Sequence, residues 1–273
     1  MPYHQKDSLS QNFIKYPDLV ADLLDVSDLK RTDTVLEIGP GRGIITNQLL
    51  KRVNQVIVVE KDPVLAAKLI EMNNNSPKLK ILPKDFLKCT LPIIPYKVFS
   101  NIPFSLTAKI ISRFLLSTVL PDSMFLIMQL EAIEKYIGFP GETQSSLLAK
   151  PWYEIKNLGD IDRSSFTSKP QVKIGLAEFK KRPIPFIKSE NKREYRDFVI
   201  YGFNQWKGTF LETYEKIFTY PQLKTLEKTF KLTSLKPTEV SFDTWLQVFK
   251  SYLKIANKEQ RETIDTFRPK NNS

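Results

Sequence analysis

Short apolar runs alternate with helix-like segments along the first 180 residues of the chain. Between these runs, apolar residues recur every three or four positions, and the first such segment begins at Pro17, where proline is tolerated as the first helical residue. Continuous apolar strands that alternate with helices are typical of a parallel sheet covered on both faces. The pattern therefore predicts a doubly wound α/β fold. The strand-length apolar runs lie at 34–39, 55–62, 79–85, 96–101 and 123–129.

The pattern changes after about residue 180. The segments 194–206 and 241–255 carry aromatic and aliphatic residues at helical spacing, and little there indicates a strand. Residues 256–273 lose the hydrophobic pattern. We therefore predict an α/β domain over residues 1–185, a small helical domain over 186–255 and a disordered tail over 256–273.

Positive charge is concentrated in the last third of the chain. The formal net charge is +11, from 41 Lys and Arg against 30 Asp and Glu. Residues 181–273 hold 18 of the basic and 11 of the acidic residues, a surplus of 7. Such a field favours a polyanionic partner. The alternative is a lysine-rich solvated surface that has no such partner.

Composition excludes several kinds of site. The chain has one cysteine, Cys89, and one histidine, His4, so an internal disulfide and a zinc site of the usual ligand types are both excluded. We expect Cys89 to be a small buried residue and assign no role to His4. No apolar run is long enough for a membrane span, and the start lacks the apolar stretch of a secretory signal, so we expect a cytoplasmic protein without a membrane or metal.

The sharpest cofactor signal is the stretch VLEIGPGRG at 35–43. Glycines between a strand and a helix allow a tight turn and the close approach of a ligand to the backbone. Gly39, Gly41 and Gly43 supply them here, but Ile44 stands where a dinucleotide fingerprint needs its last glycine. The sequence therefore argues against a nicotinamide cofactor.

Each of the first three predicted strands carries an acid near its carboxyl end. Glu37 precedes the glycines and suits a cationic ligand such as S-adenosylmethionine better than a pyrophosphate. Glu60 is placed to accept hydrogen bonds from ribose hydroxyls, and Asp85 to meet an adenine edge. Each acid alone reads equally well as a helix N-cap or a surface residue, but the set predicts a nucleoside pocket.

A set of short motifs follows one order along the chain. The motifs are QNF (11–13), EIGPGRG (37–43), VEKD (59–62), KDFL (84–87), NIPF (101–104), SSLLAKPWYEI (145–155), FTSKPQV (166–172) and SFDTWLQVFKSY (241–252). This ordered set resembles the ribosomal RNA adenine N6-dimethyltransferases, and within them the Erm-type methyltransferases of macrolide resistance. The resemblance runs from Gln11 to about Ile255. The glycine motif alone is common to many methyltransferases, whereas the ordered set is specific.

The resemblance implies a Rossmann-like methyltransferase domain at 1–185, an RNA-binding helical domain at 186–255 and S-adenosyl-L-methionine as cofactor. It places Gln11 and Asn12 against the methionine part of the cofactor, whereas Phe13 is expected to pack. The implied cofactor-binding residues are Gln11, Asn12, Glu37, Gly39, Gly41, Glu60, Lys61, Asp85, Phe86 and Asn101.

The NIPF motif explains how an adenine amine becomes reactive. We expect the Asn101 side-chain oxygen and the Ile102 carbonyl to accept its two hydrogens, which localises the nitrogen lone pair. Pro103 fixes the backbone and lacks a competing N–H, and Phe104 stacks on the base. Positioning and electrostatics then dominate, and no strong base is needed. The alternative reading is a strand-terminating turn with Phe104 in the core.

Other family positions transfer less completely. Phe166 matches the aromatic residue that would face the base opposite Phe104. Relatives commonly read F-x-P-x-P at this place, whereas this chain has Ser168 for the first proline and Ile174 where a serine is usual. Leu130 replaces a lysine that is frequent in relatives, which removes one possible phosphate contact.

The resemblance implies methylation of one adenine in 23S ribosomal RNA near the peptidyl transferase centre, with resistance to macrolides, lincosamides and streptogramin B. The base has to leave its stack, so naked or early-assembly RNA is the expected substrate, and the protein is expected to act as a monomer. One alternative is the small-subunit (16S) adenine dimethyltransferase of ribosome biogenesis. Another is a nucleic-acid-binding factor that keeps the fold without turnover. One or two transferred methyl groups remain equally open.

Overall fold

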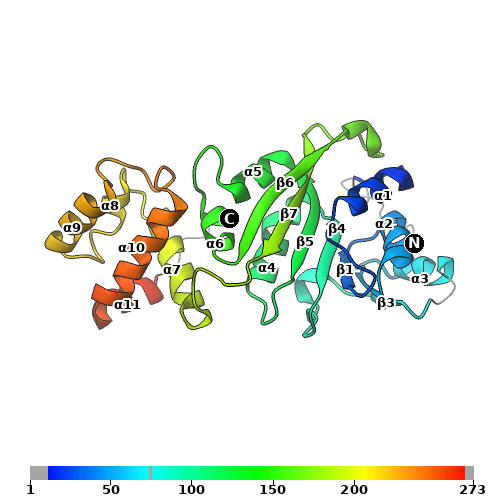
Figure 1. The fold of residues 1–273 in the computed structure, drawn as a ribbon, viewed down its shortest axis with the longest axis horizontal. Helices are drawn as coiled ribbons and strands as arrows, with labels where there is room; N and C mark the ends of the chain where they lie inside the picture. The colour runs from blue at the N-terminus through cyan, green and yellow to red at the C-terminus, as the bar shows by residue number, and fades with distance from the viewer. Residues whose placement is uncertain (1–11, 74–75, 268–273) are drawn as a thin grey trace, which may run out of the picture. The chain divides into compact units, whose positions relative to one another are not determined.

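The protein is described by a computed structural model that covers residues 12–73 and 76–267 (Figure 1). The chain divides into two compact units. Unit 1 takes Met1–Ile133 and Glu154–Lys181, and unit 2 takes Glu134–Tyr153 and Arg182–Ser273. Helix α5 (Leu130–Ile137) includes the point of division. No helix within the described ranges is both long and apolar enough to cross a membrane.

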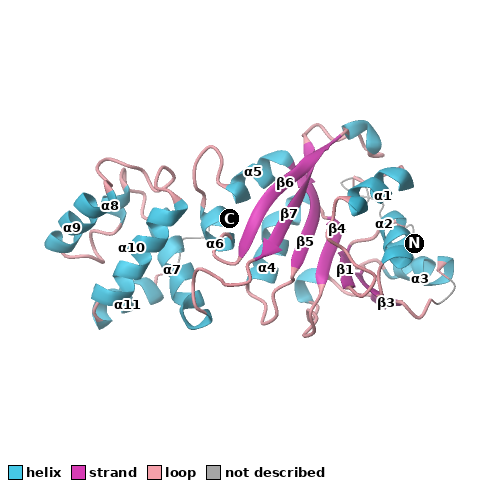
Figure 2. Cartoon of the chain, viewed as in Figure 1, coloured by secondary structure: helices cyan, strands magenta, loops and turns pink. Residues whose placement is uncertain are grey.

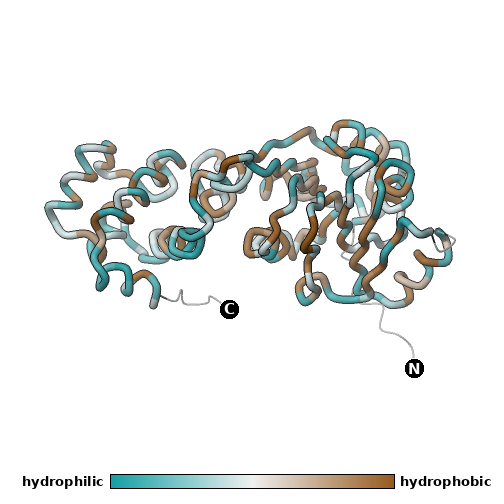
Figure 3. The backbone as a smooth tube through the Cα atoms, turned by 60° about the horizontal axis from the view of Figure 1, so that its bottom comes forward, coloured by the Kyte–Doolittle hydropathy of each residue, from teal (hydrophilic) through white to brown (hydrophobic). Residues whose placement is uncertain are grey.

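Unit 1 contains a seven-stranded sheet with the order β3-β2-β1-β4-β5-β7-β6 (Figure 2). The first five strands in that order pair in parallel, and β7 pairs antiparallel with β5. Of the seven strands, β1, β2, β3 and β5 consist mostly of hydrophobic residues, which are brown on the tube of Figure 3. Their bounds are β1 Thr34–Ile38, β2 Gln55–Val59, β3 Leu79–Leu82, β4 Lys97–Asn101, β5 Ser123–Gln129, β6 Tyr153–Ile161 and β7 Ile174–Lys181.

The two faces of the sheet are covered differently. On one face, Val35, Val56 and Val58 share a buried cluster with residues of three helices, α1 (Pro17–Asp25), α2 (Ile44–Arg52) and α3 (Pro63–Met72). On the other face, Leu36 and Ile57 lie beneath the segment 89–94, which follows the 3-10 turn η2 (Phe86–Lys88). Helix α4 (Thr107–Leu115) follows the 3-10 turn η3 (Phe104–Leu106) and runs beside η2, with the Phe86 and Phe114 rings 5.2 Å apart. The fold is the predicted Rossmann-like α/β architecture.

Two features of the sheet differ from the sequence prediction. The five predicted strands are present and pair in parallel, whereas β7, which the sequence did not predict, pairs antiparallel with β5. Strand β6 lies at the edge and has a mostly exposed pattern. Its charged and small residues do not form the continuous apolar run by which the five predicted strands were found.

Unit 2 is built from helices around an aromatic core. The Phe198 and Tyr214 rings stack with centroids 4.6 Å apart, and Trp245 meets Phe198 edge-on at 6.1 Å. Both of the predicted helical segments are helices. The bounds are α6 Gln144–Ala149, α7 Lys192–Phe203, α8 Phe210–Thr213, α9 Tyr220–Phe230, α10 Phe242–Ile255 and α11 Lys258–Asp265.

The division of the chain differs from the predicted one at 134–153, which we assigned to the first domain. Hydrogen bonds explain why this stretch belongs to unit 2. The Tyr195 hydroxyl donates to the Leu147 carbonyl oxygen at 3.0 Å, and the Glu142 N–H donates to the Thr238 carbonyl oxygen at 2.8 Å. These partners are far apart in sequence, so hydropathy alone does not reveal them.

The predicted disordered tail contains helix α11 (Lys258–Asp265). Asn257 caps its first turn by accepting a hydrogen bond from the Gln260 N–H at 2.9 Å. The Arg261 guanidinium donates to a carboxylate oxygen of Glu194 at 2.7 Å, and Ile264 is buried. The expectation of disorder is therefore wrong for this helix, and residues 268–273 lie outside the described ranges.

Candidate active site

The glycine turn between β1 and α2 has the conformation that its sequence requires. Gly39, Gly41 and Gly43 have φ values of 61°, 54° and 79°, in the left-handed region that favours glycine. A Cβ atom on Gly41 would lie 2.2 Å from Cε1 of Phe13, whereas one on Gly39 would meet no atom within 4 Å. The turn therefore leaves open space beside Gly39 and is covered by the Phe13 ring at Gly41.

Strands β1 and β4 part at the edge where the site lies. Their register covers only Val35 with Lys97 and Leu36 with Val98. Beyond it, the buried hydroxyl of Ser100 donates to the Ile38 carbonyl oxygen at 2.7 Å and accepts from the Ile38 N–H at 3.2 Å. The strand order reverses between β1 and β4, and open α/β sheets bind ligands at such a switch point.

Glu37 is a buried carboxyl group with one unpartnered oxygen. Its side chain is 1% exposed, and Oε2 accepts a hydrogen bond from the Thr46 hydroxyl at 2.6 Å. Oε1 is buried and has no hydrogen-bond partner among the described residues. Burial raises the pKa of the Glu37 carboxyl to about 8, and the nearby Glu60 charge acts in the same direction. A cation placed beside Oε1 would restore the carboxylate.

The other two predicted acids occupy different settings. Glu60 is buried, and its Oε1 accepts from the Asp62 N–H at 2.8 Å. Burial raises the pKa of Glu60, although hydrogen bonds from backbone N–H groups, including that of Gly41, oppose the rise. Asp85 caps η2 by accepting from the Leu87 N–H at 2.9 Å, so its N-cap reading holds. The neighbouring Lys61 is exposed.

Asn101 lies in the same cavity as the glycine turn. Its side-chain Nδ2 donates to the Asn12 backbone carbonyl oxygen at 2.7 Å, so the amide oxygen points away from that carbonyl. The structure thus brings together the two strongest motifs of the sequence, the glycine turn and the NIPF strand end. The cavity measures about 30 Å³ and is lined by Phe13, Ile14, Glu37, Gly39, Pro40, Arg42, Ile44, Ile45 and Asn101.

The rest of NIPF continues from the strand into a turn. The Ile102 N–H donates to the Ile127 carbonyl oxygen at 3.3 Å, and its side chain is buried. Pro103 has φ −61° and ψ 122°, and its carbonyl accepts from the Leu106 N–H at 2.9 Å. Phe104 is partly buried and packs against the core cluster. Part of the Phe104 side chain is therefore exposed to solvent, and the rest is held by packing.

Of three further predicted site residues, two are buried and one lies outside the described residues. Phe166 is 0% exposed and belongs to the core cluster, where it forms an antiparallel bridge with Ile14. The structure therefore places Phe166 in the core, in the same cluster against which Phe104 packs. Phe86 is also buried, against the Phe114 ring. Gln11 lies outside the described residues.

A family model described as "Ribosomal RNA adenine dimethylase" matches residues 3–254. The chain belongs to this family. It is therefore an S-adenosylmethionine-dependent methyltransferase that acts on adenine N6 of ribosomal RNA.

Family members with different names are similar to the chain to about the same degree. The chain is 31% identical over 179 residues to a "Ribosomal RNA small subunit methyltransferase A" of Dehalococcoides mccartyi, which covers 63% of the chain and 62% of that protein. It is 30% identical over 248 residues to an "rRNA adenine N-6-methyltransferase" of Lysinibacillus sphaericus, which covers 89% of the chain and 95% of that protein.

A solved structure has the same fold. The crystal structure of the "23S rRNA methyltransferase ErmE" superposes with a TM-score of 0.76 at 23% identity, over 88% of this chain and 98% of that one. At that identity the likeness establishes the fold of the family and not the RNA that this chain modifies.

The charges of the site fit S-adenosylmethionine. The cofactor supplies an electrophilic methyl group on a positively charged sulfur. The buried, unpartnered Oε1 of Glu37 is a suitable neighbour for a cation, and the open space at Gly39 admits a ligand close to the backbone. Glu60, directly after β2, would offer its carboxyl oxygens to the ribose hydroxyls of the cofactor. Among the described residues, no group of three or more His, Cys, Asp or Glu is arranged to hold a metal ion.

Sequence reasoning missed Thr46 and Ser100, which are both completely buried. Thr46 orients Glu37, and Ser100 bridges the parted strands. The available signal was a lone hydroxyl residue within an otherwise apolar buried pattern, in α2 and in β4 respectively. A buried polar group needs a hydrogen-bond partner, so such a position predicts a specific bond, although not which partner makes it.

Proposed function

We propose that this enzyme methylates N6 of one adenine in 23S ribosomal RNA near the peptidyl transferase centre and thereby confers resistance to macrolides, lincosamides and streptogramin B. The observation that carries the proposal is the position of Asn101 in the cavity of Glu37 and Gly39. In this proposal Asn101 binds the adenine amine, and Glu37 lies beside the bound cofactor. The 23S target is supported by the closing motif at 241–252, which resembles the closing motif of the Erm-type methyltransferases.

The chain's own residues perform the chemistry by orientation. The Asn101 Oδ1 and the Ile102 carbonyl oxygen accept the two amine hydrogens, so the nitrogen lone pair is localised and directed toward the cofactor. Phe104 stacks on the base, which leaves its position in the RNA to reach the site. This chemistry needs no strong base, because placement and electrostatics supply the acceleration. The basic helical unit holds the RNA through phosphate contacts, which weaken with salt.

A second candidate is methylation of 16S ribosomal RNA in the small subunit. The match to the Dehalococcoides protein favours it, at 31% identity against 30% for the Lysinibacillus relative. The name of the Lysinibacillus protein states no ribosomal subunit, so its greater coverage does not separate the two targets. The motif at 241–252 is the reason that we prefer the large-subunit target.

Primer extension on both ribosomal RNAs separates the two targets. RNA is prepared from a macrolide-sensitive host that carries the protein, the Asn101→Ala variant or an empty vector. We expect one new stop in 23S RNA, only with the active protein, together with growth on a macrolide. A stop confined to 16S RNA, without resistance, would refute the 23S target and leave the enzyme class intact. Binding of tritiated cofactor without labelling of either RNA would support a non-catalytic factor.

A further inference from the structure

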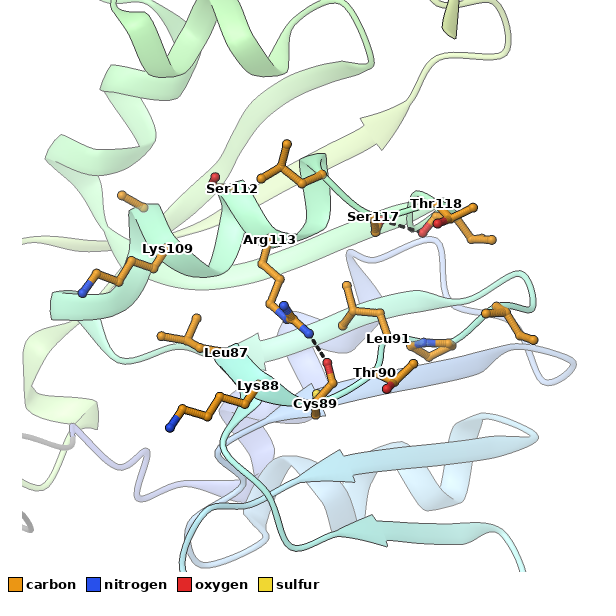
Figure 4. Close-up of a pocket in the computed structure, with 15 residues that line it drawn as sticks. Leu87, Lys88, Cys89, Thr90, Leu91, Lys109, Ser112, Arg113, Ser117 and Thr118 are labelled. Carbon is orange, nitrogen blue, oxygen red and sulfur yellow. Dashed lines mark hydrogen bonds between the residues drawn. The ribbon is translucent and has the colours of Figure 1, made fainter. Parts of the chain in front are cut away.

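A groove of about 850 Å³ lies beside helix α4, outside the cofactor site (Figure 4). One wall is the segment 87–93, which includes the end of η2. The other wall is α4 together with residues 116–119. Both walls belong to unit 1. The proposed chemistry uses none of the groove's residues, so the groove requires its own explanation.

The charges on this groove are all positive. Lys88, Lys109 and Arg113 line it, and its lining residues, all of which lie in the described part of the chain, include no Asp or Glu. The sequence has no acidic residue between Asp85 and Asp122, a stretch that supplies both walls. The groove therefore suits an anionic ligand better than a cationic or neutral one.

Arg113 is held in place by its neighbours. Its guanidinium donates a hydrogen bond to the Cys89 carbonyl oxygen, as Figure 4 shows. The centre of the guanidinium lies 5.9 Å from the centroid of the Phe86 ring, a cation–π contact. Its Nε is buried and has no hydrogen-bond partner among the described residues. The guanidinium, held by these contacts, lines the groove with its positive charge, whereas the unpartnered Nε lies inside the protein.

The positive lining continues past the segment 89–93. On the far side of this segment is a second cavity of about 440 Å³, which shares residues 89–93 with the groove. Lys80 and Lys84 line it, and its described lining residues also include no acid. Positive side chains thus lie on both sides of the segment 89–93. Together they cover a longer surface than the binding of a single ion needs.

Two lysines connect the groove to the active site. Lys88 ends η2, which Asp85 caps directly after β3. Lys109 lies in the first turn of α4, five residues after Phe104 of the NIPF motif. The carboxyl ends of β3 and β4 lie at the same edge of the sheet, with β2 and β1 between them. Both lysines therefore follow strand ends at the edge that carries Asn101. Figure 4 shows their side chains directed toward the same end of the groove.

We infer that this groove binds the sugar–phosphate backbone of the RNA strand that flanks the target adenine. The inference rests on the RNA substrate of the proposed function and not on which ribosomal RNA is modified. Lys88 and Lys109 contact phosphates next to the extruded base, and Arg113 holds a phosphate further along the groove. Apolar walls such as Leu91 and Leu116 suit the sugars and unpaired bases of a single strand.

The test is a salt titration of RNA binding with matched charge reversals. The groove variant is Lys88→Glu with Lys109→Glu. The control is Lys51→Glu with Lys68→Glu, which makes the same charge change at exposed positions of α2 and α3, the helices that cover the opposite face. In vitro transcribed 23S and 16S RNA are the probes, and binding is measured by filter retention from 50 to 300 mM salt.

We expect the groove variant to bind RNA about tenfold more weakly or worse, with the log–log salt slope reduced by about 1.4, near 0.7 for each lost single-strand phosphate contact. The control should keep the wild-type slope. Lys88→Arg with Lys109→Arg should restore binding, since it keeps both charges. Calorimetric cofactor binding should be unchanged in every variant, which shows that the fold is intact.

Three outcomes would overturn the inference. The first is a wild-type salt slope in the groove variant. The second is an equal loss in the control, which would show that net charge alone is responsible. The third is normal binding of naked RNA with lost methylation only in ribosomal particles, which would make the groove a protein-docking site. Failure of the wild-type protein to label 23S RNA would refute the proposed target and leave this titration readable.

Discussion

Asn101 donates its side-chain N–H to the backbone carbonyl oxygen of Asn12, 89 residues earlier in the chain, at 2.7 Å. The bond fixes which end of the Asn101 amide faces the cavity. An asparagine without such a partner rotates between two nearly equivalent orientations, and only one of them offers an acceptor to an amine. The segment at Asn12 therefore takes part in the chemistry by orienting a residue that lies far away in the sequence.

Replacing Asn101 by alanine should separate binding from chemistry. Removing one such oriented group should lower the rate of methyl transfer by about 10²–10³-fold, as removal of a single transition-state hydrogen bond does in other enzymes. Cofactor affinity should change little, because Glu37 and Glu60 remain. Calorimetry of cofactor binding and tritium transfer to RNA measure the two effects. Comparable loss of both would place Asn101 in the cofactor pocket alone.

Substitutions at Phe104 should distinguish stacking from packing. Phe104→Tyr keeps a ring face and should retain most activity, whereas Phe104→Leu loses a stacking contact of about 1–3 kcal/mol. The side chain also packs against the core cluster, so unfolding by urea is measured alongside methyl transfer. If Leu and Tyr variants were equally active and differed only in stability, Phe104 would be a core residue.

Glu37 should make the stability of the cofactor-free protein depend on pH. Its folded-state pKa of about 8 lies above the ordinary value of 4.5, because burial disfavours the carboxylate. The stabilisation is therefore fully present below pH 4.5 and is lost as the pH rises through 8. Glu60 contributes with the same sign, since burial raises its pKa as well.

The variant Glu37→Gln isolates this contribution. Its unfolding free energy should fall less than that of the wild type between pH 5.5 and pH 8.5, and the difference between the two proteins reports Glu37 alone. Wild-type affinity for the cationic cofactor should rise over the same range, while the variant should bind weakly at every pH. Parallel stability curves for the two proteins would show that the carboxyl does not titrate in this window.

Loss of the Ser100 hydroxyl should cost stability out of proportion to its size. Ser100→Ala would leave the Ile38 N–H and carbonyl oxygen without their bridge inside the protein, at about 1–3 kcal/mol. Ser123→Ala is the matched control, because Ser123 is also buried but bonds to one side-chain oxygen of the half-exposed Asp28. Urea denaturation should rank Ser100→Ala as clearly the less stable. Equal midpoints would mean that water or a local shift replaces the bridge.

The sequence predicted what local pattern determines. Apolar runs predicted β1 to β5, and the glycines predicted a turn whose three residues all have positive φ. Phe166 shows the limit of such prediction. It is buried and pairs with Ile14, 152 positions away, and a similarity of sequence motifs does not report whether a side chain is buried. The pairing of Thr46 with Glu37 likewise depends on how α2 packs, which no periodicity reveals.

The cavity around Glu37 and Asn101 measures about 30 Å³, enough for roughly one or two water molecules and far too little for a nucleoside. Phe13 forms part of its wall and fills the place of a side chain at Gly41. A bound cofactor therefore extends beyond this cavity, and the open space beside Gly39 is room that the described residues leave for it.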